Sequence, residues 1–196
     1  MIKDFLIINC TNKNNSIALK INSKFFFKNL QTNLIKNEMI VLDILAFFKE
    51  NNVKTDDKFS LIVNSGPGSF SGIRIALAVA KGIQLVNNVT IYSYNYFLLN
   101  AAPYLSEKMK IISIQKTNKF YYYSEGNFKD HYTFTAPKKI NFNFTNEKNS
   151  IVVAPQEIAN DQIFNKISLK KIKIAQYDLK NIEILIENNL LENKLI

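Results

Sequence analysis

The sequence is poor in cysteine, glycine and proline, and these scarcities limit the kinds of protein that it can encode. Its 196 residues include 1 cysteine, 5 glycines, 4 prolines and no tryptophan. Because Cys10 has no second cysteine to pair with, an intrachain disulfide is excluded and a reducing compartment is indicated. No apolar run approaches the ~20 residues of a membrane-spanning helix, and the first apolar run is too short for a signal peptide. We therefore expect a cytoplasmic protein that does not enter a membrane.

The chain is instead rich in apolar residues and in lysine. Its hydrophobic fraction of 47% is enough for a packed core, which argues against a wholly disordered chain. Its net charge of +9 has two interpretations. A basic surface can bind nucleic acid, or the excess can reflect a composition rich in Lys, Asn and Ile. The lysines are spread along the chain, which favours the second interpretation for any single lysine. An RNA-containing partner stays open for the protein as a whole.

One stretch, residues 63–81, concentrates the residues that are scarce elsewhere. It contains three of the 5 glycines and the only arginine, Arg74. Glycine is required where the backbone takes a positive φ or where another group approaches closely. The planar guanidinium of arginine makes paired hydrogen bonds that lysine does not make. We therefore expect this stretch to be the structural centre of the chain.

The first hundred residues predict three strands followed by alternating helices and strands. Short apolar runs and alternation with a period of two indicate strands, whereas longer apolar stretches indicate helices. Short polar turns separate the three opening strands, so we expect an antiparallel meander. The predicted strands span 3–9, 16–21, 24–28, 59–63 and 89–92, and the predicted helices span 34–51, 71–86 and 95–101.

The two long predicted helices are apolar on more than one side. A helix that covers one sheet has an apolar stripe and a polar face, but in residues 39–48 only Asp43 is polar. In the second helix, Gly72, Ala76 and Ala80 form a ridge of small residues that another helix could approach closely. We expect the two helices to pack together and to leave apolar surface for another protein.

The second half of the chain predicts shorter elements and a smaller lobe. A hairpin turn is expected near Thr117, a short helix after Pro155, and an amphipathic helix from 179 to 195. No linker or internal repeat separates the two halves. The predicted strands span 110–115, 120–125, 132–135, 151–154 and 172–175.

The segment GPGSFSG, residues 66–72, has three competing interpretations. It lacks the GK[ST] ending of a phosphate-binding P-loop. Its glycine spacing fits a dinucleotide loop between a strand and a helix, but residues 87–97 supply no acidic side chain for the ribose. The helix N-terminus could still hold an anion, with Ser69 or Ser71 as the capping residue. The third interpretation, favoured by spacing alone, is a tight turn in which Phe70 fills the core.

The wider segment resembles a family signature. Residues 64–77, NSGPGSFSGIRIAL, are similar to the GPGSFTGLRIGL motif of the bacterial TsaB (YeaZ) family, and residues 80–82 match its A-K-G run. The order of elements extends this resemblance loosely over the first hundred residues. The motif residues carried over as a structural loop are Gly66, Pro67, Gly68, Ser69, Phe70, Ser71, Gly72 and Arg74.

The resemblance implies a fold and a function. Family members are α/β proteins of two ribonuclease-H-like lobes of the actin/hexokinase/Hsp70-like (ASKHA) type. Here this implies a first lobe at 1–102 and a reduced second lobe at 103–196. Members are non-catalytic partners of TsaD, which together with the ATPase TsaE transfers threonylcarbamoyl to the adenosine beside the anticodon of tRNAs that read ANN codons. The resemblance implies no cofactor, no metal and no catalytic residue, an indirect contact with tRNA, and homodimerisation.

The same resemblance implies that the helices of the first lobe bind TsaD. This agrees with the apolar surface expected above from the pattern of the two helices. The interface residues expected on this basis are Met39, Asp43, Phe47, Ala76 and Ala80.

The sequence departs from the family pattern at three places. Residues 8–11 read INCT where the family commonly has Ile-Asp-Thr-Ser, so Asn9 replaces an aspartate that could bind phosphate or metal in an actin-like fold. The family's His-Ser falls near residues 36–37 (KN), and its Asp-Ala-Arg falls near residues 115–117 (QKT). These departures weaken the case for nucleotide chemistry. They leave the partner-binding interpretation intact, because that interpretation depends on the helices.

Other candidate catalytic residues are isolated in the sequence. His131 is the only histidine and has no cluster of metal-binding residues beside it. Ser69 and Ser71 have no evident His–Asp support, and Cys10 has no cation close in sequence to activate it. Residues 121–123 (YYY) could stack on bases, although a strand with aromatic faces is favoured. The alternatives to an accessory subunit are an actin-like nucleotide-binding enzyme and, less favoured, a peptidase.

Overall fold

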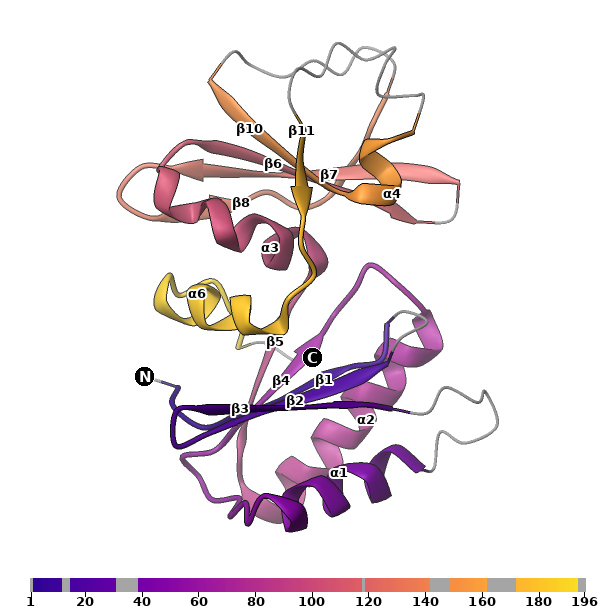
Figure 1. Cartoon of the computed structure of the whole chain (residues 1–196), viewed down its shortest axis with the longest axis vertical. Coiled ribbons are helices and arrows are strands. Elements are labelled where there is room, and N and C mark those ends of the chain that lie inside the picture. Colours follow the sequence, from indigo (N-terminus) through magenta and orange to yellow (C-terminus); the bar gives the residue numbers. More distant parts are fainter. Residues whose placement is uncertain are drawn as a thin grey trace. The chain divides into compact units, whose positions relative to one another are not determined.

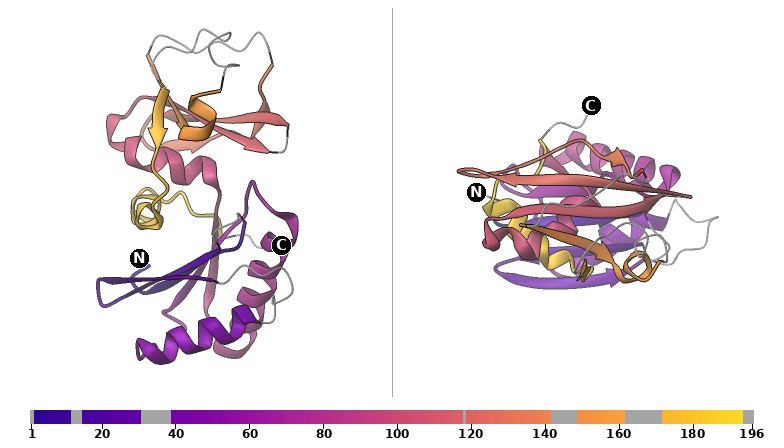
Figure 2. Two further views of the ribbon diagram at one scale, coloured as in Figure 1. Left: turned by 45° about the vertical axis from the view of Figure 1, so that its right-hand side comes forward. Right: turned by 90° about the horizontal axis from the view of Figure 1, so that it is seen from above.

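The computed structural model describes residues 2–11, 15–30, 39–117, 119–141, 149–161 and 172–193. The chain forms two compact units, each with its own sheet (Figures 1 and 2). Unit 1 comprises Met1–Asn95 together with Leu191–Ile196, and unit 2 comprises Tyr96–Leu190. The boundary drawn from the sequence after residue 102 differs from this division, because helix α3 (Tyr96–Ala101) packs against strands of the second sheet.

Unit 1 is built on a 5-stranded sheet with the order β3-β2-β1-β4-β5. The first three strands form the predicted antiparallel meander, and the last two extend the sheet in parallel. Strand β1 is buried along its whole length, as a continuous apolar run predicts for a central strand. The strands are β1 (Phe5–Asn9), β2 (Ser16–Ile21), β3 (Lys24–Asn29), β4 (Ser60–Asn64) and β5 (Thr90–Tyr94).

Two helices, α1 (Met39–Glu50) and α2 (Phe70–Asn87), cover one face of this sheet (Figure 1). In α1 the buried positions are Ile40, Ile44 and Phe47, which recur every third or fourth residue as on one side of a helix. They join the buried residues of α2 and of the strands in one core cluster. The first part of the predicted helix, residues 34–38, lies outside the described residues.

The ridge of Gly72, Ala76 and Ala80 packs on the sheet and not, as predicted, on another helix. All three residues are buried, and α2 contacts β1, β4 and β5. A Cβ atom at Gly72 would overlap the carbonyl oxygen of Cys10, just beyond the end of β1. The small side chains therefore let the helix lie close to the strand backbone. The spacing in the sequence predicted a close contact correctly but assigned it to the wrong neighbour.

Unit 2 repeats the strand order of unit 1. Its main path reads β8-β7-β6-β10-β11, in which the first three strands are antiparallel and the last three are parallel. Both units therefore have the ribonuclease-H-like topology that was predicted. The strands are β6 (Lys110–Thr117), β7 (Phe120–Phe128), β8 (Tyr132–Phe134), β10 (Ser150–Pro155) and β11 (Ile172–Ala175), with β9 (Lys138–Lys139) paired to β7.

The helices of unit 2 are short in the part of the chain that the structure describes. They are α3, η1 (Ala102–Glu107), α4 (Gln156–Ala159), η2 (Leu179–Asn181) and α6 (Ile182–Glu187). The predicted helix 179–195 is wrong in its length. It ends at Glu187 because Asn189 takes a left-handed φ of 54°, after which Glu192 forms a bridge with Ser93 of β5. No helix among the described residues combines the length and the hydropathy needed to cross a membrane.

Candidate functional site

The GPGSFSG loop is held against the end of β1. The backbone N–H of Ser69 donates to the carbonyl oxygen of Thr11 at 2.8 Å, and Gly68 lies directly against the same residue. Gly66 has a φ of 110°, which an L-residue rarely adopts, and the Gly66–Pro67 peptide is cis. These contacts agree with the tight-turn interpretation of the loop.

Ser69 caps the helix that follows the loop. Its Oγ accepts a hydrogen bond from the N–H of Gly72 at 3.3 Å, and it lies 3.0 Å from the Oγ of Ser71. The backbone of Ser69 is extended, as is usual at an N-cap. Both hydroxyls are thus occupied locally, and neither has a hydrogen bond to a histidine or a carboxylate in the described part of the chain.

Asn9 lies in a buried set of hydrogen bonds, at the position where the resemblance led us to expect an aspartate. The Oγ1 of Thr11 and the Nδ2 of Asn64 both donate to the Oδ1 of Asn9, at 2.8 and 3.1 Å. The Oδ1 of Asn64 in turn accepts the N–H of Gly66 at 2.8 Å. The side chains of Asn9, Thr11 and Asn64 are buried and neutral. This polar cluster therefore ties β1, β4 and the glycine-rich loop together and supplies no carboxylate for a metal or a phosphate.

The thiol of Cys10 lies beside this cluster and is protected from solvent. Cys10 is 2% exposed, and burial raises the pKa of the thiol from 9.0 to about 12. A thiol needs a lowered pKa to act as a nucleophile at neutral pH. The position of Cys10 therefore agrees with the predicted inert core thiol.

The positions of His131 and of the acidic side chains bear on whether the described residues could hold a metal. In the described ranges, no three His, Cys, Asp or Glu side chains come together as a metal site. His131 is exposed in the turn between β7 and β8, where its carbonyl oxygen accepts the N–H of Lys129. Among the described residues of the polar cluster, the hydrogen bonds given above join neutral groups.

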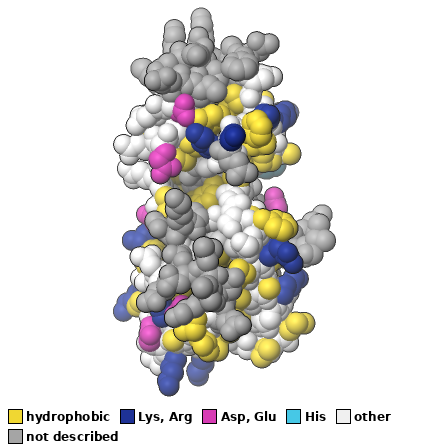
Figure 3. All heavy atoms as spheres, turned by 90° about the vertical axis from the view of Figure 1, so that its right-hand side faces the viewer, with side chains coloured by type: hydrophobic (Ala, Val, Ile, Leu, Met, Phe, Trp, Pro, Cys, Tyr) yellow, Lys and Arg dark blue, Asp and Glu magenta, His cyan; other side chains and the backbone are white. Residues whose placement is uncertain are grey.

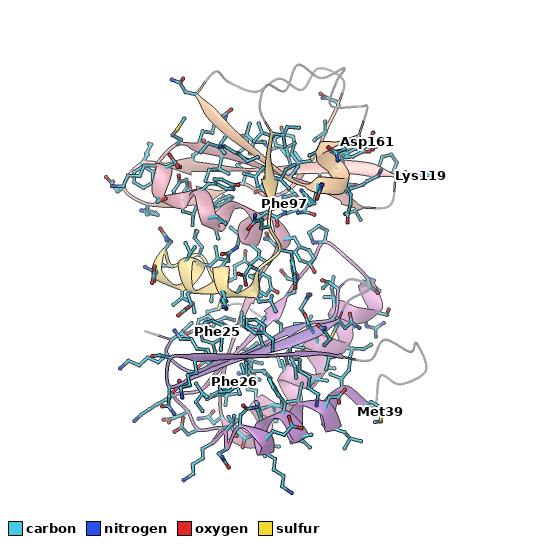
Figure 4. The ribbon with its side chains drawn as sticks, viewed as in Figure 1. Phe25, Phe26, Met39, Phe97, Lys119 and Asp161 are labelled. Carbon is cyan, nitrogen blue, oxygen red and sulfur yellow. The ribbon has the colours of Figure 1, made fainter. Side chains whose placement is uncertain are left out.

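The helices of unit 1 present large apolar side chains to solvent. We call this surface the outer helical face, and its members lie on the sides of α1 and α2 that turn away from the sheet. Figure 3 shows exposed hydrophobic side chains over unit 1, and Figure 4 labels Met39 at the start of α1. The exposed fractions are Met39 43%, Val41 41%, Leu42 57% and Leu45 55% in α1, and Phe70 74%, Leu85 86% and Val86 82% in α2.

The predicted interface residues are divided between this face and the core. Met39 belongs to the outer helical face, and Asp43 is half-buried with a carboxylate 3.6 Å from the ammonium of Lys28. In contrast, Phe47 is 5% exposed, and Ala76 and Ala80 are 0% exposed. Placing these three at an interface was wrong, because the sheet already covers them.

The sequence interpretation missed the large apolar residues at the exposed positions. Leu42, Leu45 and Leu85 were not selected, although they lie opposite the buried stripe. Ala78 and Gly82 also face outward, one turn apart, and a Cβ atom at Gly82 would meet nothing within 4 Å. The sequence did indicate these residues, because each helix has apolar residues on two of its sides. Which of the two sides is buried depends on where the sheet lies, and the sequence of the helix alone does not show that.

Phe70 begins α2, and Arg74 lies one turn further along on the same side of the helix. The guanidinium carbon of Arg74 lies 5.5 Å from the centroid of the Phe70 ring, a cation–π distance. The idea that Phe70 fills the core is wrong, since 74% of the residue is exposed. Both side chains are therefore available to a partner at one end of the outer helical face.

One curated relative resembles the chain in sequence. It is the tRNA threonylcarbamoyladenosine biosynthesis protein TsaB of Buchnera aphidicola subsp. Baizongia pistaciae (strain Bp), which is 31% identical over 136 residues. The match covers 65% of this chain and 61% of that protein, so the chain spans less than two thirds of the length of this relative. No protein-family model matches the chain.

Solved structures resemble the chain over most of its length. YeaZ from Pseudomonas aeruginosa superposes with a TM-score of 0.70 at 10% identity, over 94% of this chain and 91% of that one. A Pseudomonas aeruginosa protein described as similar to peptidase YEAZ gives a TM-score of 0.69 at 10% identity, over 97% and 95%. The filament protein AlfA from B. subtilis gives 0.51 at 9% identity, over 94% and 98%. At these identities the similarity establishes the fold, which is ribonuclease-H-like and actin-like.

Proposed function

We infer that the chain is a member of the TsaB (YeaZ) family, because its glycine-rich signature, its 31% identity to a TsaB protein and its fold agree with one another. We propose that it takes part in making threonylcarbamoyladenosine in tRNA, as a non-catalytic subunit that binds TsaD in a complex that also includes TsaE. The observation that carries this proposal is the outer helical face of unit 1.

The outer helical face suits a lasting protein contact. Large aliphatic side chains on two helices remain exposed in the isolated chain, and such a patch is typical of a protein–protein interface. Exposed Ala78 and Gly82 leave room for the backbone of a partner helix to approach. Arg74 and Phe70 add a cation and an aromatic ring, residue types that are enriched at interfaces.

The polar cluster supports an accessory role over catalysis. Asn9 is neutral, and its Oδ1 already accepts hydrogen bonds from Thr11 and Asn64. A group that binds the phosphates or the metal of a nucleotide would need to replace those bonds. The cluster therefore serves the alignment of the loop and of α2, on which the partner face lies.

Co-expression with the cognate TsaD tests the proposal. The wild-type chain is expected to co-purify as a stable complex, whereas Leu42→Glu combined with Leu85→Glu should weaken binding by about 100-fold or more, since a desolvated, unpaired carboxylate at an interface costs several kcal/mol. The matched control is Phe27→Glu. Phe27 is 51% exposed on β3, away from the outer helical face, and its replacement should leave the complex intact.

Two outcomes would overturn the proposal. One is a wild-type chain that neither co-purifies with TsaD nor supports threonylcarbamoyl transfer to tRNA in a reconstituted assay. The other is tight binding of ATP or ADP by the isolated chain together with hydrolysis, which would favour the actin-like enzyme.

A further inference from the structure

One end of the sheet in unit 2 carries lysines and aromatic side chains that the proposed function does not use. We call it the basic hairpin edge and define it as Lys119, Phe120, Tyr122, Lys138 and Lys139. In the sequence, residues 115–123 and 136–141 contain four lysines and no Asp or Glu. Local positive charge therefore accumulates here on strands that are paired to each other.

The register of the strands places Phe120, Tyr122 and Lys139 on one face of the sheet, whereas Lys138 pairs with Tyr123 and lies on the other face, so the lysines flank the edge from both sides. Tyr122 of β7 pairs with Lys139 of β9, and paired residues share a face of the sheet. Phe120 lies two positions from Tyr122, so it shares that face as well. The ammonium of Lys139 lies 3.5 Å from the centroid of the Phe120 ring, and 47% of Phe120 is still exposed. Lys119 lies at the end of the β6–β7 hairpin (Figure 4).

The carboxylate of Asp161 is engaged on the other face. Its Oδ2 lies 3.3 Å from the ammonium of Lys116 and accepts a hydrogen bond from the hydroxyl of Tyr121. Tyr121 pairs with Lys116 and alternates with Phe120 and Tyr122, so this pair points away from the ring of Phe120. Lys119, Lys138 and Lys139 are exposed, and none of them has an ion pair to Asp161 among the described residues.

We propose that the basic hairpin edge binds RNA directly, with its lysines on phosphates and the ring of Phe120 against an unpaired base. Lysines alone on an edge strand can be explained as protection against aggregation, but an exposed phenylalanine in the same place acts against that protection. Cations beside an exposed ring are the combination that binds single-stranded nucleic acid. The net charge of +9 favours a polyanionic partner. The identity of the RNA as tRNA rests on the proposed function, whereas direct contact goes beyond it.

Binding of a fluorescently labelled, unmodified tRNA transcript by the full-length chain tests this proposal. The key variant combines Lys119→Gln, Lys138→Gln and Lys139→Gln. The control combines Lys24→Gln, Lys54→Gln and Lys58→Gln, which removes the same charge from exposed positions of unit 1. The hairpin variant should bind about tenfold more weakly at low salt and lower the slope of log K against log salt by about 2, since each phosphate contact to a single strand contributes about 0.7. The affinity of the control variant for the transcript should stay within about twofold of that of the wild type.

A second variant tests the aromatic contact. Phe120→Leu should weaken binding by about fivefold or more with an unchanged salt slope, because stacking on a base does not release ions. In the wild type, ultraviolet crosslinking to 4-thiouridine-substituted transcript should label the peptide that contains Phe120.

An equal loss of RNA affinity in the two triple-lysine variants would overturn the proposal, because net charge alone would then explain the binding. So would a wild-type chain that binds anionic phospholipid vesicles through the same residues and does not bind the transcript. Loss of TsaD binding in Leu42→Glu/Leu85→Glu with RNA binding retained would confirm that the two surfaces are separate. Failure to bind TsaD in the wild type would leave the RNA result to stand by itself, so the two proposals fail in distinguishable ways.

Discussion

The two units share a strand order and differ in what they do with buried polar groups and with helices. In unit 1 the buried side chains of Thr11 and Asn64 both donate hydrogen bonds to Asn9, and long helices lie close on the sheet. In unit 2, Ser113 and Gln115 of β6 have buried polar atoms without a hydrogen-bond partner among the described residues. One topology thus carries a buried hydrogen-bonded cluster and long helices in unit 1, and short helices among the described residues of unit 2.

The difference extends to the surfaces. Unit 1 exposes aliphatic side chains on α1 and α2, whereas unit 2 exposes lysines and Phe120 at the end of a hairpin. A ribonuclease-H-like sheet leaves its edges and the outer sides of its helices free to diverge, because neither contributes to the central core. The two units therefore present different chemistry to partners despite their common fold.

The largest expected effect comes from replacing one glycine in each unit by alanine, which adds a methyl group: Gly72 of α2 in unit 1 and Gly126 of β7 in unit 2. A Cβ atom at Gly72 would overlap the backbone carbonyl of Cys10, which cannot move without shifting β1 or α2. A Cβ atom at Gly126 of β7 would instead meet the ring of Phe134, a side chain that can rotate. Gly72→Ala should therefore destabilise the protein by about 3 kcal/mol or more, and Gly126→Ala by about 1 kcal/mol.

Urea unfolding monitored by circular dichroism measures the free energy of unfolding of both glycine variants. Hydrogen exchange shows in which unit the backbone amides lose protection. Equal costs for the two substitutions would break the comparison, since the closer packing of unit 1 would then have no energetic consequence.

A smaller effect is expected from removing one buried hydroxyl in each unit. Thr11→Val deletes a donor to Asn9 and should cost about 1 kcal/mol, the usual value for one hydrogen bond. Ser113→Ala deletes a buried hydroxyl that has no partner in the described part of the chain and should be neutral or stabilising by up to about 1 kcal/mol. Differential scanning calorimetry of the two variants gives the sign of each change. A clear destabilisation in Ser113→Ala would show that the hydroxyl is satisfied after all.

The smallest effect is a pH dependence at Cys10. Its folded pKa is raised by burial to about 12, against 9.0 for an unburied thiol. Below pH 9 the thiol is neutral in the folded and the unfolded state. Above pH 9 the thiol ionises in the unfolded state alone, which stabilises that state. The free energy of unfolding therefore falls progressively between pH 9 and about 12. The free energy of unfolding of the wild type, relative to Cys10→Ala, should therefore fall across this window. A constant difference between pH 8 and 10.5 would argue that the thiol is accessible in the folded state.

Local sequence determined much of the architecture. Apolar runs and alternation predicted the strands of both sheets, because a strand's periodicity depends only on its own residues. Ser69 was one of the two predicted capping residues. It could be predicted because the N-cap bond, from the N–H of Gly72 to Ser69, spans only three residues. The two-residue β9 was missed, because Lys138 and Lys139 form a strand only by pairing with β7.

The sequence by itself determined that α2 has apolar residues on both sides; the tertiary structure alone decided which side is buried. Leu85 and Val86 are larger and more apolar than Ala76 and Ala80, so hydropathy favours burying the leucine side. The close approach of Cys10 to Gly72 decides otherwise, because only the small ridge fits against the strand backbone. That steric requirement comes from residues more than sixty positions apart, and it is what places the large aliphatic side chains on the surface.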